Sequence, residues 1–190
     1  MKTREKIENL LMATGRSGMQ DLLEWMHKNG FYDAPCSGKY HLSQPGGLAE
    51  HSLNVLTYAL KIATAMFDES EDQITFETIE SITICALLHD LGKSGQFGKP
   101  NYIKNNGDDA GTVPYKTNND LLYVPHEIRS IAIASKFIDL TEQEQYAIIY
   151  HNGLYGELTG FKGKENPLLL ILHHADMWAA RFKEREDKNK

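Results

Sequence analysis

Residues 86–93 read Ala-Leu-Leu-His-Asp-Leu-Gly-Lys, so a histidine and an aspartate stand side by side within an apolar run. Upstream of this pair, apolar residues recur about every 3.6 positions, which predicts a helix packed on a core. The stripe comprises Ile79, Ile82 and Ala86. His89 continues it by one further step of three. Adjacent helical residues project about 100° apart, so His89 and Asp90 share a site only where the helix ends, and Gly92 is expected to supply that end.

A second helix is expected over residues 46–67, and it carries another polar residue toward the core. Its apolar stripe comprises Leu48, Val55, Ala59, Ile62 and Met66. His51 lies on this stripe between its first two members. The spacing therefore predicts that His51 points inward.

Two more helices place polar residues on their apolar faces. Thr141 and Glu144 form the pattern of a capping box, which opens a helix that ends at His151 before Gly153. Asn166 is expected to cap the last helix, with Pro167 as its first residue. In that helix Asp176 shares a face with Leu169 and Leu172.

Burying an imidazole or a carboxylate costs roughly several kcal/mol unless a partner compensates it. Any one of these histidines taken alone is best interpreted as a core residue bonded to a carbonyl. The adjacent pair His89-Asp90 must, however, be explained together with His51, His151 and Asp176. A shared metal ion explains all of them at once.

Three stretches of the chain resemble the HD superfamily of metal-dependent phosphohydrolases, which is named for a His…His-Asp…Asp pattern. Residues 46–53 read Gly-Gly-Leu-Ala-Glu-His-Ser-Leu, and they resemble the family's first signature as residues 86–93 resemble its second. His174-Ala175-Asp176 is similar to the closing signature. The resemblance covers about residues 40–182. The long helical stripes and the scarcity of alternating runs predict an all-α domain of about seven or eight helices, with at most a small β-hairpin within residues 94–123, and the resemblance implies that it is an HD-type helical bundle.

The resemblance also implies a set of metal ligands, comprising His51, His89, Asp90, His126, His151 and Asp176. Some members of the superfamily hold a second ion through two extra histidines, and His126 and His151 match them. A dinuclear centre bridged by Asp90 is therefore expected. An exposed first-turn residue remains an alternative interpretation of His126. Nitrogen and oxygen ligands do not distinguish among Mn, Fe, Co, Ni, Zn and Mg.

The same resemblance assigns the chemistry to Asp90 and Lys93. Lys93 is similar to a family position that offers a charge to the phosphate, although a lysine that answers the helix dipole fits equally well. His41 resembles a histidine near the active site in an exoribonuclease branch of the superfamily.

Residues 94–123 are expected to be largely irregular, with Tyr102-Ile103-Lys104 paired to Pro114-Tyr115-Lys116. They form either a substrate-binding lid or a surface excursion, and the sequence leaves both open. The substrate-binding candidates are Lys93, Lys99, Tyr102, Lys104, Tyr115, Lys116 and His41.

Composition sets the remaining expectations. The chain has 190 residues and is 41% hydrophobic, which predicts one domain over 1–190, with helices in 1–30 packed on a core at 40–182. Two cysteines give no disulfide framework, so we expect a cytoplasmic protein. The longest aliphatic run, Leu168 to Leu172, is too short to span a bilayer. The net charge of −6 argues against a nucleic-acid partner.

The expected function is therefore metal-dependent hydrolysis of a phosphate ester, with a nucleotide or a related small phosphorylated molecule as substrate. A di-iron oxygenase with a similar ligand set is an alternative, as is a non-catalytic binding or regulatory module that retains the fold. Whether the substrate is a monoester or a diester stays open. The oligomeric state also stays open.

Overall fold

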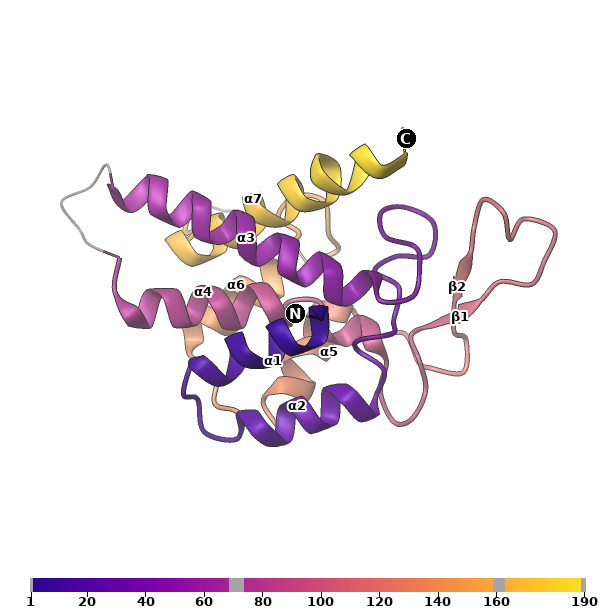
Figure 1. The fold of residues 1–190 in the computed structure, drawn as a ribbon, viewed down its shortest axis with the longest axis horizontal. Coiled ribbons are helices and arrows are strands. Elements are labelled where there is room, and N and C mark those ends of the chain that lie inside the picture. The colour runs from indigo at the N-terminus through magenta and orange to yellow at the C-terminus, as the bar shows by residue number, and fades with distance from the viewer. Residues whose placement is uncertain (1, 69–73, 159–162, 189–190) are drawn as a thin grey trace.

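The computed structural model describes residues 2–68, 74–158 and 163–188. This part of the chain forms seven α-helices, two short 3-10 helices and one small hairpin (Figure 1). The α-helices are α1 (Thr3–Ala13), α2 (Met19–Lys28), α3 (Gly47–Asp68), α4 (Phe76–Leu88), α5 (His126–Ala134), α6 (Glu142–Tyr150) and α7 (Pro167–Arg181). The 3-10 helices are η1 (Leu91–Ser94) and η2 (Lys183–Lys188). The predicted all-α class is confirmed.

One hydrophobic core joins all the α-helices. In the ribbon, α3 lies alongside α7, and α4 lies between α3 and α1 (Figure 1). The two N-terminal helices contribute fully buried side chains to the same core, among them Ile7, Leu11, Leu22 and Met26. Within the described residues, no helix is long and apolar enough to cross a membrane.

The predicted helix starts are confirmed. Thr141 and Glu144 form a reciprocal capping box at the start of α6. The Asn166 side chain accepts a hydrogen bond from the Leu169 amide at 2.8 Å, and Pro167 is the first residue of α7. These caps satisfy amides that would otherwise lack partners, and they fix where the two helices that carry His151 and Asp176 begin.

Two details of the predicted stripes are wrong. Ile79 and Met66 are partly exposed, at 38% and 60%, because they lie at helix ends beyond the core. The helix that carries the His-Asp pair ends at Leu88, before Gly92. Gly92 instead permits η1 to approach α5 closely, since a Cβ there would lie 2.3 Å from the His126 carbonyl oxygen.

The predicted hairpin is confirmed within residues 94–123. Strand β1 (Tyr102–Lys104) pairs antiparallel with β2 (Tyr115–Thr117), with Tyr102 opposite Thr117. The Tyr115 amide donates to the Gly38 carbonyl at 3.1 Å, so the hairpin is tied to the loop before α3. Beyond this contact the hairpin extends away from the helices (Figure 1).

Candidate metal centre

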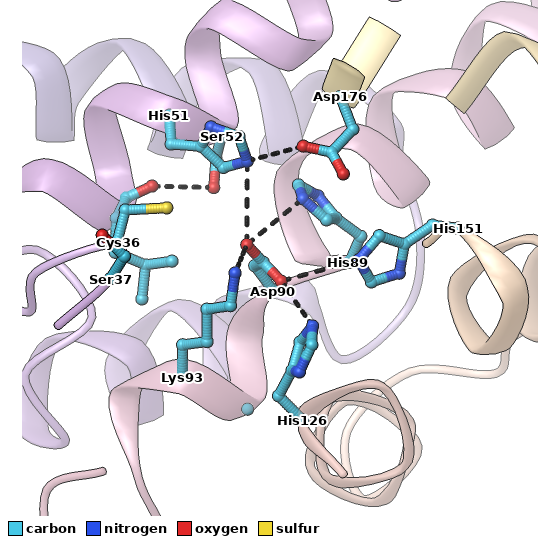
Figure 2. A network of polar contacts seen from close by, with 12 residues as sticks. Cys36, Ser37, His51, Ser52, His89, Asp90, Lys93, His126, His151 and Asp176 are labelled. Atoms are coloured by element: carbon cyan, nitrogen blue, oxygen red, sulfur yellow. Dashed lines mark hydrogen bonds and ion pairs between the residues drawn. The ribbon is translucent and has the colours of Figure 1, made fainter. Parts of the chain in front are cut away.

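The six predicted ligands lie together at the middle of the helical bundle, and Figure 2 shows them around Asp90. His51 and Asp176 come from within α3 and α7. The other four stand at helix ends: His89 and His151 cap α4 and α6, Asp90 precedes η1, and His126 begins α5. At a helix end, neighbouring residues are free to turn toward one point, which explains how His89 and Asp90 both reach the centre.

Asp90 faces imidazoles on both of its oxygens (Figure 2). Its Oδ2 lies 3.4 Å from His89 Nε2 and 3.7 Å from His51 Nε2. Its Oδ1 lies 3.1 Å from His126 Nε2 and 3.7 Å from His151 Nε2. This carboxylate therefore stands between two pairs of histidine nitrogens.

The histidines turn Nε2 toward the centre because their other nitrogen is occupied. His89 Nδ1 lies 3.0 Å from the Ala86 carbonyl, and His151 Nδ1 lies 2.8 Å from the Ile148 carbonyl. A carbonyl only accepts, so Nδ1 donates in each case. In the neutral ring Nε2 then keeps its lone pair, as a metal ligand must. Burial lowers the pKa of His151 to about 3, which keeps that ring neutral.

Two histidines are supported by buried carboxylates instead. His51 Nδ1 donates to Glu184 Oε1 at 2.9 Å. His126 Nδ1 lies 3.3 Å from Glu127 Oε2, and Asn152 donates to the other oxygen of Glu127 at 2.6 Å. Carboxylates behind ligating histidines fix the ring orientation and raise its basicity.

Three buried polar atoms at the centre indicate whether the site suits a cation. His51 Nε2, His89 Nε2 and Asp90 Oδ1 are buried without a hydrogen-bond partner. Burial raises the pKa of Asp90, but nearby positive charge, that of Lys93 foremost, more than offsets this and holds that pKa well below its usual range, so the carboxylate is charged. Unpaired lone pairs around a buried carboxylate are costly by themselves. A divalent cation satisfies them, so these residues fit a metal.

Glu184 is a residue behind the ligands that the sequence did not predict. It lies in η2, eight residues after Asp176, and is only 3% exposed. Burial raises its pKa, but hydrogen bonds from His41 and His51 outweigh burial and lower that pKa to about 2. It also accepts from Asn54 Nδ2 at 3.1 Å. The only available signal was its spacing from Asp176, and α7 ends between the two residues.

His41 lies beside the centre, as the resemblance implied. Its Nδ1 contacts Glu184, and its ring centroid is 4.8 Å from that of His51. Cys36 Sγ lies 3.9 Å from His41 Nε2. Glu184 thus connects His41 to the ligand set. A role for His41 in substrate binding stays a prediction.

The other predicted substrate-binding residues divide into two groups. Lys93 and Tyr102 line a cavity of about 420 Å³ that opens beside His126. Four others, Lys99, Lys104, Tyr115 and Lys116, are not among its lining residues. The Lys99 ammonium donates to the Asp120 carbonyl and Lys116 pairs with Asp109 at 3.2 Å, so these two charges are engaged elsewhere.

A family model, the HD domain, matches residues 48–189. This range is well over half of the chain, and it contains all six residues of the centre. The chain therefore belongs to the HD domain family, a superfamily of metal-dependent hydrolases. No curated protein and no solved structure shows a significant match to the chain.

Proposed function

We propose that this protein is a metal-dependent phosphohydrolase with a dinuclear centre, acting on a nucleotide or a related small phosphate ester. The observation that carries this proposal is the position of Asp90 between two pairs of imidazoles, one pair at each carboxylate oxygen. His51, His89 and Asp176 would hold one ion, and His126 and His151 the other, with Asp90 shared.

Two ions bound there would acidify a water molecule and stabilise the charge that develops on the phosphoryl oxygens. Lys93 would contribute a fixed positive charge. Its Nζ lies 2.6 Å from Asp90 Oδ2. Burial lowers the pKa of Lys93, but Asp90 outweighs this and raises that pKa above its usual value, so the ammonium stays charged. It lines the cavity, where it would bind a phosphoryl oxygen.

The lining of this cavity supports a small nucleotide-like substrate. Beyond Lys93 and His126, it presents amide, hydroxyl and phenol groups from the residue before the hairpin, the hairpin itself and the segment that follows it. These are Asn101, Tyr102, Thr117, Asn118, Asn119 and Tyr123. Such groups bind the base and sugar of a nucleoside through hydrogen bonds and stacking. The volume of about 420 Å³ suits a small molecule rather than a polymer.

The test is metal analysis combined with a phosphate-release screen. The purified chain is loaded separately with Mn, Ni, Co and Mg and offered nucleoside mono-, tri- and cyclic phosphates, with and without oxygen. We expect release of phosphate or of a phosphorylated product that depends on the metal and not on oxygen. Bound iron with an oxygen-dependent product would instead indicate the oxygenase alternative. Full metal loading without any turnover would indicate a binding module.

A further inference from the structure

Arg129 is a buried arginine in the wall of the cavity beside the centre. It lies in α5 one turn after His126, lines the same cavity as Lys93, and is 3% exposed. Its guanidinium donates to Asn101 Oδ1 at 3.0 Å and to the Leu122 carbonyl at 2.8 Å. Both acceptors are neutral. Within the described residues, no carboxylate lies within ion-pair distance of Arg129, so its charge is not balanced locally.

The guanidinium also has an unsatisfied donor. Its Nε is buried and has no hydrogen-bond partner. A buried cation without a counter-charge is strongly unfavourable, and a buried donor without an acceptor adds to that cost. Arg16 gives the contrast within this chain, because it pairs with both Glu80 and Glu144. Arg129 thus lacks what a purely structural arginine has.

The fold holds Arg129 at a fixed position relative to Asp90. A Cβ on Gly92 would lie 2.9 Å from Arg129 Cβ, so η1 and α5 are in close contact at this point. The hydroxyl of the next residue, Ser130, accepts from the Gly92 amide at 2.8 Å and donates to the His89 carbonyl at 2.7 Å. The cation is therefore placed by the same backbone that places the centre.

We propose that Arg129 binds a second phosphoryl group of the substrate, adjacent to the one held at the metals. The substrate class would then be a compound with at least two linked phosphoryl groups, such as a nucleoside di- or triphosphate. This inference rests on the proposed function. Lys93 contacts Asp90 directly, so its charge belongs to the phosphoryl group at the metals. Arg129 contacts none of the six residues of the centre through hydrogen bonds, and its planar fork suits a further phosphate.

The test compares the binding of pyrophosphate and inorganic phosphate to the Mn-loaded protein by calorimetry. Wild type should prefer pyrophosphate. Arg129→Gln should weaken pyrophosphate binding about ten- to hundredfold, the range for losing a hydrogen bond to a charged group, while phosphate binding and metal content stay unchanged. Arg129→Lys keeps the charge but loses the planar guanidinium, so its affinity for pyrophosphate should lie between those of wild type and Arg129→Gln. The matched control is Arg181→Gln, which removes an exposed arginine stacked 4.3 Å over the ring of Tyr155.

Equal pyrophosphate affinity in wild type and both Arg129 variants would overturn the inference and make Arg129 structural. Circular dichroism and metal content show whether each variant is folded, and Arg129→Lys carries the test if the glutamine variant is not. The outcome is separable from the proposed function. An Arg129-dependent preference for pyrophosphate without any ester hydrolysis would contradict only the proposed hydrolase function. Hydrolysis without that preference would contradict only the role of Arg129.

Discussion

Two carboxylates are buried equally deeply in this protein, and their surroundings differ. Glu144, which is 0% exposed, accepts hydrogen bonds from Arg16 at 3.0 and 3.1 Å, from Ser81 at 2.8 Å and from the Thr141 amide at 2.8 Å. Asp90, which is 1% exposed, accepts from Lys93, while its Oδ1 has no hydrogen bond. One cluster is complete within the chain, and the other is complete only with a cation.

This difference separates a structural cluster from a functional one. Both sets of charges are buried by the same core, so burial alone does not distinguish them. The distinguishing feature is whether polar atoms remain without partners after all contacts within the chain are counted. A ligand that satisfies them binds the folded state alone and raises its stability. The centre should therefore respond to metal, and the Glu144 cluster should not.

The largest expected effect comes from matched amide substitutions in the two clusters. Asp90→Asn should abolish binding of both ions and lower phosphate release at least about a hundredfold, since it removes the shared charge. Glu144→Gln should leave metal content and turnover intact but lower the free energy of unfolding by about 1.5–3 kcal/mol. Elemental analysis gives the metal content, a kinetic assay gives the rate of phosphate release, and urea unfolding gives the free energy of unfolding. Full metal content in the Asp90 variant would refute the assignment of the centre.

A second substitution should remove one of the two ions and leave the other bound. His126→Ala should reduce the metal content from two ions toward one, because His51, His89, Asp90 and Asp176 still hold the other. Catalysis should fall sharply, since one of two cooperating ions is lost. His151→Ala should act alike. The control is His27→Ala, whose ring contacts Arg4 outside the centre and should change neither quantity.

A smaller effect on metal affinity is expected from the carboxylate that supports a ligating histidine. Glu184→Gln removes the charge that orients His51 and should weaken binding of that ion about 10- to 100-fold while the protein still folds. Competition with a metal chelator gives the affinity. Glu24→Gln, which alters an exposed pair with Lys28, is the matched control. If both variants bind metal like wild type, Glu184 contributes packing only.

The smallest effect concerns acid stability. Burial raises the pKa of Glu144, but hydrogen bonds from Arg16 and Thr141 outweigh burial and lower that pKa below its usual value. A depressed pKa gives stability that is complete above the unfolded value of about 4.3 and is lost as the pH falls. The stability difference between metal-free wild type and Glu144→Gln should therefore be full at neutral pH and shrink below about pH 4.3. A difference independent of pH would contradict this.

Local periodicity and caps predicted the helices and the inward direction of His51, His89, His151 and Asp176, whereas the full set of six ligands, with His126 among them, was implied by the resemblance to the HD superfamily. Thr141, Asn166 and Pro167 each mark a helix start by chemistry that involves only near neighbours. Glu184 and Arg129 were not predicted because nothing local distinguishes a buried charge from an exposed one. Their burial depends on contacts with residues distant in sequence, such as His51 for Glu184 and Asn101 for Arg129.

Electron paramagnetic resonance of the Mn-loaded protein shows whether one buried carboxylate, Asp90, is shared by two ions. Two Mn²⁺ ions bridged by one carboxylate are magnetically coupled, whereas isolated ions give independent spectra. We expect two ions per chain with a coupled spectrum, and a single uncoupled ion in His126→Ala. One ion per chain in wild type, or two ions without coupling, would contradict this expectation.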